Sequence, residues 1–297
     1  METFVLLTIT GLGLAAMYFL IASGLSLIYG LMGVLNFAHG SFLTIGAFGS
    51  WAITEYLDWI DNSTLRFVVA GVFGIAVGAV FAALVELVLI RPLYRRHVEQ
   101  ILVTVGLSLC VGALVQAIWG PEVQVYQAPA WMVDTTTVLG ARIPNDRFVE
   151  IAAAVVVFVV LVTFLQRTRY GLVIRAGVEN RGMVTALGID VRRAFTLVFT
   201  IGGVAAALAG VLTGVYFGGV EPQRGTAVLI FAFIVVVIGG LGSITGSAVA
   251  AVIVGLLQQY ANYYASSGIG DMAVIALLAI VLLLRPGGLS DRLAPAH

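Results

Sequence analysis

The 297-residue sequence contains no lysine and few charged residues of any kind. Only 10% of its residues are charged, whereas soluble domains carry roughly 25%. All 15 basic residues are arginine, so the sequence has neither the lysine of a phosphate-binding loop nor a Schiff-base lysine. The formal net charge is +0, which provides no overall field for nucleic acid. We therefore expect no nucleotide site built on lysine and no nucleic-acid partner.

Cysteine and histidine are also scarce. The single cysteine, Cys110, excludes intrachain disulfides and cysteine-based zinc clusters. Because it lies within an apolar run, we predict that it is buried as a small hydrophobic residue. The three histidines, His39, His97 and His297, are scattered, and no paired buried acids accompany them. We expect no metal, no cofactor and no catalytic activity of this chain.

Hydrophobic residues, by contrast, make up 61% of the chain, and its mean hydropathy is +1.08. A water-soluble core of this size could not bury so much apolar surface. Lipid accepts that surface and requires the backbone to satisfy its hydrogen bonds within helices. The composition therefore predicts an all-α fold, a polytopic bundle of transmembrane helices that forms one domain over residues 1–297.

Nine apolar segments approach the length of about 20 residues that crosses the hydrocarbon of a bilayer. They lie at residues 4–29, 36–54, 65–90, 100–118, 148–166, 194–217, 226–240, 245–264 and 271–284. The segment 226–240 is short enough to be re-entrant, and the turn at residues 30–35 is a candidate for a broken helix. We predict eight or nine spans, the first of them retained at the N-terminus.

The positions of the arginines predict the orientation of the chain, because short cytoplasmic loops carry an excess of positive charge. Eleven of the 15 follow the third, fifth and ninth segments: Arg91, Arg95, Arg96, Arg167, Arg169, Arg175, Arg181, Arg192, Arg193, Arg285 and Arg292. This distribution predicts an external N-terminus and a cytoplasmic C-terminus. It also predicts an external loop at residues 119–147 and a cytoplasmic loop at residues 167–193.

A polar, glycine-containing stretch at residues 29–41 stands where the second apolar segment should begin. If a helix begins near Asn36, the three-and-four spacing of helices gives it one small, polar face. The N-terminus of a helix inside a membrane offers free N–H groups and a partial positive charge, which suit a solute carboxylate. The predicted residues of a translocation path are Asn36, His39, Gly40, Ser41 and Thr44.

The same stretch has a structural interpretation of equal weight. Asn36 can cap the helix, the glycines can permit close packing, and His39 can bond a neighbouring carbonyl. A second glycine-rich stretch at residues 239–247 resembles the first and indicates an internal repeat. Its spacing does not fit the dinucleotide fingerprint G-x-G-x-x-G, so close helix packing or a bend is its expected use.

Glu86 is the acidic residue that we place inside a predicted span, near the cytoplasmic end. Charged side chains at membrane depth are costly unless they are paired or reach the interface. We therefore expect Glu86 to pair with Arg91.

The centre of the predicted cytoplasmic loop, residues 174–188, is amphipathic and predicts a short helix that ends at Gly188. Its arginines and Glu179 are expected to stay solvated. The apolar stripe of this helix would consist of Val178, Met183, Val184 and Leu187. Such a helix suits either the groove of a partner or the lipid surface, and the segment alone favours neither.

In three stretches, residues 29–40, 175–189 and 205–210, the chain resembles the permease family of bacterial branched-chain amino acid ABC importers. It is more similar to the H-type subunit than to its M-type partner, and the likeness covers nearly the whole chain. The resemblance implies a transport subunit of the bacterial inner membrane that is not an enzyme. It also implies a second permease, either M-type or a second copy, two cytoplasmic ATPases and an external solute-binding protein.

The resemblance further implies roles for individual residues. The ATPase-coupling candidates are Arg175, Val178, Glu179, Asn180, Met183, Leu187 and Gly188, and the helix after Asn36 would face the path. The expected solutes are branched-chain or other amino acids, with urea, amides and related small acids also within the family's range. The alternative is an ion-coupled secondary transporter without an ATPase, which needs carboxylates or histidines within its spans. Glu86 and His39 are the residues that support it.

Overall fold

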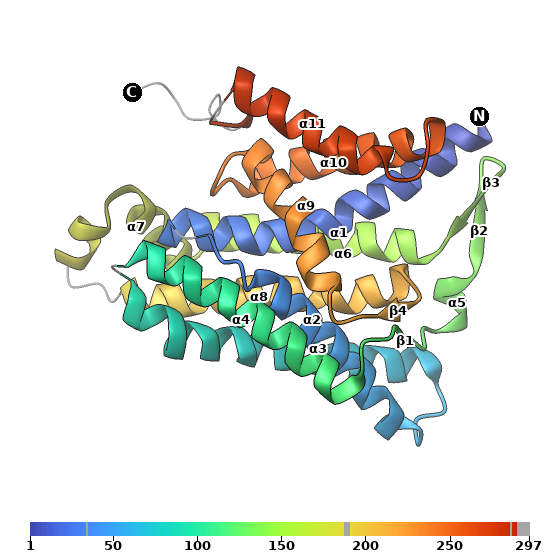
Figure 1. Cartoon of the computed structure of the whole chain (residues 1–297), viewed down its shortest axis with the longest axis horizontal. Coiled ribbons are helices and arrows are strands. Elements are labelled where there is room, and N and C mark those ends of the chain that lie inside the picture. The colour runs from blue at the N-terminus through green and yellow to red at the C-terminus, as the bar shows by residue number, and fades with distance from the viewer. Residues whose placement is uncertain (34, 95, 187–190, 286, 290–297) are drawn as a thin grey trace.

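A computed structural model of the chain describes residues 1–33, 35–94, 96–186, 191–285 and 287–289, and gives the backbone alone at residues 178–182, 185, 186 and 191. Within these ranges helices dominate (Figure 1). The α-helices are α1 (Glu2–Met32), α2 (His39–Thr54), α3 (Ser63–Val85), α4 (His97–Trp119), α5 (Ala130–Val133), α6 (Asp146–Arg167), α7 (Arg169–Ala186), α8 (Val191–Tyr216), α9 (Arg224–Gly239), α10 (Ile244–Tyr264) and α11 (Ile269–Leu284). Shorter helical turns are η1 (Glu55–Leu57), the π-helical η2 (Glu86–Ile90) and η3 (Arg91–Leu93).

Six of the helical segments are long and apolar enough to cross a membrane: α1, α3 with its continuation to Leu93, α4, α6, α8 and α10. Helices α9 and α11 are apolar but shorter, and α2 has 16 residues. Each of the nine predicted segments coincides with one helix. The prediction of a polytopic helical bundle is thus confirmed, although six candidate spans are fewer than the predicted eight or nine.

Helix α1 lies at the centre of the bundle and packs against α6, α8, α9 and α10 (Figure 1). Its middle, from Leu14 to Ile28, is buried on every side because partners surround it. A second group forms where α2, α3 and α8 pack together. By contrast, α4, α6 and α11 expose large apolar side chains along most of their length, as lipid-facing helices do.

The all-α prediction missed two short antiparallel strand pairs. Strand β1 (Gln124–Val125) pairs with β4 (Gly219–Val220), and β2 (Thr135–Val138) pairs with β3 (Ala141–Pro144). The β2–β3 turn places Leu139 at φ 51° and Gly140 at φ 88°, which is the geometry of a tight two-residue hairpin. The predicted external loop is therefore an ordered unit made of α5, this hairpin and β1.

Cys110 is exposed on α4, which corrects the prediction that it is buried. The apolar run around it was interpreted as core. In a membrane protein the same pattern also marks a helix whose surface faces lipid or a partner, and Leu109 beside it is exposed as well.

The two glycine-rich stretches predicted from the sequence meet in space. A Cβ built on Gly30, in the last turns of α1, would lie 3.1 Å from the Cα of Gly242, which precedes α10. Gly242 has φ +86°, a conformation that favours glycine. The contact fits the expected role in close packing. The internal repeat stays a prediction.

Close packing of α2 on α8 generates a first testable prediction. A Cβ on Gly46 would lie 2.6 Å from the Cα of Ala207, so Gly46→Ala must push the two helices apart. Overpacking of this kind costs about 1–3 kcal/mol. We expect a lower thermal unfolding midpoint for the purified variant, measured in detergent.

The matched control is Gly106→Ala on α4, where a Cβ would meet nothing within 4 Å. This substitution is expected to leave the midpoint unchanged or to raise it slightly, because alanine has the higher helix propensity. Equal midpoints for the two variants would contradict the tight α2–α8 contact.

Candidate translocation site

The described residues between α1 and α2, 33 and 35–38, turn the chain back into the bundle without forming a helix. Gly33 ends α1 in the left-handed conformation, at φ 67°, and its N–H donates to the carbonyl of Tyr29 at 2.7 Å. Asn36 then accepts the N–H of Ala38 on its Oδ1 at 3.0 Å, a local turn typical of asparagine. Helix α2 therefore begins at His39 rather than near Asn36, which corrects the predicted start.

His39 shows how deep inside the bundle α2 begins. Its Nε2 donates to the carbonyl oxygen of Ile21 at 3.1 Å, and its side chain is fully buried. At 1.5 Å per residue, Ile21 lies about 28 Å along α1 from its start and about 16 Å from its end. The N-terminus of α2 thus lies far from both ends of a helix long enough to span the membrane.

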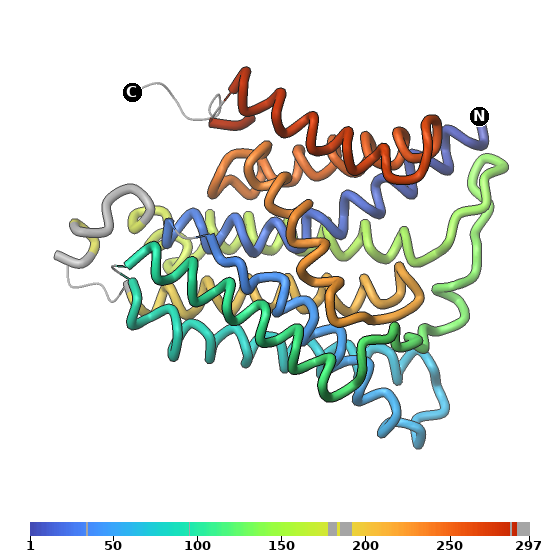
Figure 2. The backbone as a smooth tube through the Cα atoms, in the orientation of Figure 1, coloured from blue at the N-terminus to red at the C-terminus, as the bar shows by residue number. Residues whose placement is uncertain are grey.

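Helix α9 also begins inside the bundle, against the start of α2. A Cβ on Gly40 would collide with the carbonyl of Gly225, and a Cβ on Gly225 would collide with Gly40 and with the hydroxyl of Thr44. Figure 2 shows α9 running obliquely to α1 and α10, starting near the middle of the bundle. Two helix N-termini, each with a partial positive charge, therefore converge at one buried point.

A small cavity lies next to this point. It encloses about 10 Å³, roughly the room of one water molecule. Its walls come from α2, α8, β4 and the turn into α9, and its lining residues are Leu43, Thr44, Ala47, Gly210, Thr213, Gly214, Gly219, Val220, Glu221 and Arg224. The α2 residues in this wall follow the three-and-four spacing expected from the sequence, so one predicted face of α2 is realised here.

The structure separates the five predicted path residues. Gly40 and Thr44 lie at the contact with α9, whereas His39 faces α1 and Asn36 lies in the segment before the helix. Ser41 is buried at 4% exposure. The amide Nδ2 of Asn36 and the Nδ1 of His39 are buried and have no hydrogen-bond partner among the described residues. The carbonyl contact of His39 fits the structural interpretation. The unpartnered nitrogens of Asn36 and His39 fit the interpretation that these residues line a translocation path.

Helix α7 covers most of the predicted coupling segment. It starts at Arg169, five residues earlier than expected, and packs against α1, α6 and α8. Arg175 is exposed, as predicted. The expected apolar stripe does not form one buried face, because Val184 is buried whereas Met183 is 63% exposed. Adjacent helical residues point about 100° apart, which explains the split.

The other coupling candidates have less structural description. Val178, Glu179 and Asn180 lie in the part of α7 described by its backbone alone, and Leu187 and Gly188 lie outside the described residues. The predicted helix end at Gly188 therefore stays a prediction.

Glu86 pairs with Arg91, as predicted. The carboxylate is fully buried in η2, and Arg91 Nε lies 3.5 Å from its Oε1. Tyr94 donates its hydroxyl to Oε1, and Thr196 on α8 donates to Oε2 at 2.7 Å. Burial raises the pKa of Tyr94, which keeps its hydroxyl protonated as a donor. This Glu86 cluster ties η2 to the start of α8.

The sequence analysis missed a second buried acid. Glu150 on α6 is 1% exposed and lies 3.6 Å from Arg147, which also approaches Asp146 at 3.3 Å. The guanidinium of Arg147 stacks on the ring of Tyr216 at 3.4 Å. Glu150 lies within the predicted segment 148–166, so Glu86 is not the one acidic group in a span. The i,i+3 spacing of Arg147 and Glu150 was the available signal.

The unit of α5, the β2–β3 hairpin and β1 packs on the C-terminal end of α2. Tyr126, next to β1, hydrogen-bonds Ser50 at 2.5 Å, and Trp51 donates to the carbonyl of Val125 at 3.1 Å. Burial raises the pKa of Tyr126 to about 12, so its hydroxyl stays protonated. These contacts hold β1 and β4 above the cavity.

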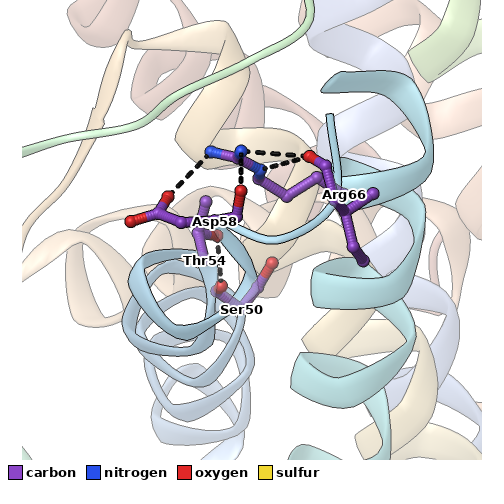
Figure 3. Close-up of polar contacts among 5 residues, drawn as sticks. Ser50, Thr54, Asp58 and Arg66 are labelled. Carbon is purple, nitrogen blue, oxygen red and sulfur yellow. Dashed lines mark hydrogen bonds and ion pairs between the residues drawn. The ribbon is translucent and has the colours of Figure 1, made fainter. Parts of the chain in front are cut away.

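An ion pair fixes the turn between α2 and α3 (Figure 3). Arg66 lies 3.1 Å from Asp58 and donates to the carbonyl of Ile60 at 3.0 Å. Thr54 donates to the carbonyl of Ser50 at 2.9 Å in the last turn of α2. The Asp58 carboxylate is largely exposed, so this pair contributes little to stability.

A polytopic bundle with helices that begin inside it is the architecture of a membrane transport protein. Residues 7–284 match the family described as the branched-chain amino acid transport system / permease component. The chain is 32% identical over 289 residues to the high-affinity branched-chain amino acid transport system permease protein LivH of Salmonella typhimurium, covering 95% of this chain and 94% of the relative. It is 30% identical over 293 residues to the permease protein BraD of Pseudomonas aeruginosa, covering 96% and 94%. No solved structure matches the chain.

The chain therefore belongs to the branched-chain amino acid transport system permease family. It is a permease component of an ABC importer and not an enzyme, and ATP hydrolysis belongs to a separate subunit. The resemblance seen in the sequence is confirmed, and the ion-coupled secondary transporter is not favoured.

The Glu86 cluster generates a second prediction. Glu86→Ala removes the acceptor of Tyr94 and Thr196 and leaves the Arg91 charge without its carboxylate. Each buried group left unpaired costs roughly 1–3 kcal/mol. We expect a clear drop in the thermal unfolding midpoint of the detergent-solubilised chain.

Glu99→Ala serves as the control, because Glu99 is an exposed acid in the first turn of α4. Its loss is expected to cost well under 1 kcal/mol, the scale of an exposed helix-end charge. A Glu86 variant as stable as the Glu99 variant would show that the cluster contributes nothing.

Proposed function

We propose that this chain lines the translocation path of an importer for small polar solutes, with branched-chain or other amino acids as the expected substrates. Urea, amides and related small acids are the other solutes in range. The observation that carries the proposal is the buried meeting point of the α2 and α9 N-termini, beside Gly40 and Thr44. Helix N-termini at membrane depth attract the carboxylate of a solute, and transporters of other folds use broken helices in this way.

The proposed path passes the first turn of α2, where two buried polar nitrogens have no partners. The Nδ2 of Asn36 and the Nδ1 of His39 are buried and unpaired among the described residues. An unpaired buried polar atom costs free energy unless a ligand or water completes it. A solute moving past this turn can accept a hydrogen bond from Asn36 Nδ2 and donate one to His39 Nδ1, because the imidazole hydrogen is on Nε2.

We further propose that the N-terminus lies outside the cell, the C-terminus lies in the cytoplasm, and eight or nine segments cross the bacterial inner membrane. Figure 1 places α7 and the β2–β3 hairpin at opposite ends of the bundle. The α7 end carries most of the arginines, including the exposed Arg175, which supports its cytoplasmic location. Residues 167–193 are then the cytoplasmic loop, and residues 119–147 are the external loop that meets the solute-binding protein.

The proposed assembly contains this chain, a second permease of the M type or a second copy, two ATPases and the binding protein. The ATPases dock on α7. Exposed residues on α7, Arg175 and Met183 among them, support a contact surface there, while buried Val184 anchors the helix to the bundle. ATP-driven closure would reach α8 through this contact as a rigid-body movement.

The path proposal generates a third prediction. Asn36→Ala and His39→Ala are each expected to lower the rate of solute uptake several-fold while the importer still assembles, because each removes a proposed solute contact. Uptake of radiolabelled leucine per assembled complex is the measurement.

The controls are Asn62→Ala and His97→Ala, which remove the same side-chain types from exposed positions at the starts of α3 and α4. Both are expected to leave uptake unchanged. Loss of folded protein in the Asn36 and His39 variants, with normal uptake by what remains, would favour a purely structural role.

The docking proposal generates a fourth prediction. Affinity purification of the chain from its native membrane in mild detergent should recover two ATPase subunits and a second permease, identified by mass spectrometry. Glu179→Arg is expected to weaken ATPase recovery and to abolish uptake while leaving membrane insertion intact, because it reverses a charge in the proposed contact helix.

Arg142→Glu on β3 is the control, since it makes a charge reversal at the opposite end of the bundle. ATPase recovery is expected to be normal for this variant. If the wild-type chain purifies alone under the same conditions, the importer assembly proposed here is wrong.

A further inference from the structure

The turn into α9 carries a pair of opposite charges that the proposed path has not yet used. Arg224 Nη2 lies 3.1 Å from Glu221 Oε2, and the guanidinium stacks 4.1 Å from the ring of Phe217. Both charged residues line the small cavity beside Thr44. The pair therefore borders the point where the two helix N-termini meet.

This pair lies within the thickness of the membrane. Arg224 precedes Gly225, which touches Gly40, and the neighbouring His39 bonds the carbonyl of Ile21. Ile21 is about 16 Å from the nearer end of α1 by helix rise, and the hydrocarbon is roughly 30 Å thick. Charged groups at this depth face protein or a water-filled cavity rather than lipid.

Part of the Glu221–Arg224 pair is accessible at the surface of the chain. The Glu221 and Arg224 side chains are 28% and 25% exposed, respectively. The Nε of Arg224 is buried and has no hydrogen-bond partner among the described residues. Because lipid would penalise this accessible edge, the edge faces a water-filled path or a neighbouring subunit.

The chemistry of the pair matches one class of solute. A guanidinium offers a planar fork that binds a carboxylate through two hydrogen bonds, and stacking on an aromatic ring holds its plane. A carboxylate such as Glu221 accepts from an ammonium group. An α-amino acid carries both groups on one carbon, so a single zwitterion can replace the partner of each residue and leave no charge unpaired.

We propose that Glu221 and Arg224 form the recognition point for the ammonium and carboxylate groups of a zwitterionic amino acid in the translocation path. This assignment rests on the proposed importer function and adds its specificity-determining residues. The N-terminus of α2 lies beside the carboxylate end, where its dipole adds to the guanidinium charge. When the two residues pair with each other, the pair closes the cavity.

The test uses the complete importer reconstituted in proteoliposomes, with leucine as the probe and uptake measured per assembled complex. Arg224→Gln and Glu221→Gln are each expected to lower leucine uptake about tenfold or more, because one charge of the zwitterion loses its partner. The matched control is Arg66→Gln, which breaks the external Arg66–Asp58 pair of the same length. Uptake by this control is expected to stay within about twofold of wild type, since such exposed pairs contribute little.

A charge exchange separates recognition from a structural role. The double variant Glu221→Arg/Arg224→Glu restores an ion pair in the turn but reverses both charges along the path. We expect its leucine uptake to stay about tenfold low, because hydrogen bonds to charged groups carry this much energy and are now misplaced. Recovery to the wild-type rate would overturn the proposal and make the pair a structural lock.

The remaining outcomes are also decisive. If the Gln variants do not assemble, Arg224→Lys and Glu221→Asp decide: a raised KM supports the proposal, and an unchanged KM in both overturns it. A wild-type importer that takes up urea or an amide but no amino acid overturns this assignment alone. A wild-type complex that takes up none of these solutes overturns the importer proposal itself.

Discussion

Backbone contact between Gly40 and Gly225 allows two helices to start inside this bundle. Any side chain at either position would collide with the facing main chain. The contact brings two positive helix ends together in a region of low dielectric constant, where their repulsion is weakly screened. The Glu221 carboxylate and the Thr44 hydroxyl lie next to these ends and offset that repulsion. The geometry of α2, of α9 and of the cavity between them depends on this one close approach.

The two ends of the structure constrain this central contact in different ways. At the C-terminal end of α2, the Tyr126–Ser50 hydrogen bond and the β1–β4 pair hold the unit of α5, the β2–β3 hairpin and β1 against α2 and α8. At the opposite end of the bundle, the Glu86 cluster holds η2 against the first turns of α8. Helix α8 contacts both α2 and α7, so it links the proposed ATPase surface to the wall of the cavity.

The sequence predicted the helices well because lipid leaves the backbone few alternatives, and apolar length alone locates them. The Glu86–Arg91 pair and the carbonyl contact of His39 could also be predicted, since a buried polar group needs a partner. Other features could not be predicted from the sequence. The start of α2 depends on the local turn at Asn36, and the burial of Glu150 depends on its close approach to Gly13 of α1. Cys110 and Met183 show the same limit, because apolar composition does not say whether a surface meets protein or lipid.

The exposed thiol of Cys110 is useful for chemical labelling, because the chain contains no lysine. A maleimide probe has one possible site, on a helix at the outside of the bundle, and attaches there once water reaches the thiol. Amine-reactive reagents find only the N-terminus, so lysine-directed cross-linking cannot map the contacts of this subunit with its neighbours. Its carboxylates and its single thiol are the groups through which those contacts can be chemically recorded.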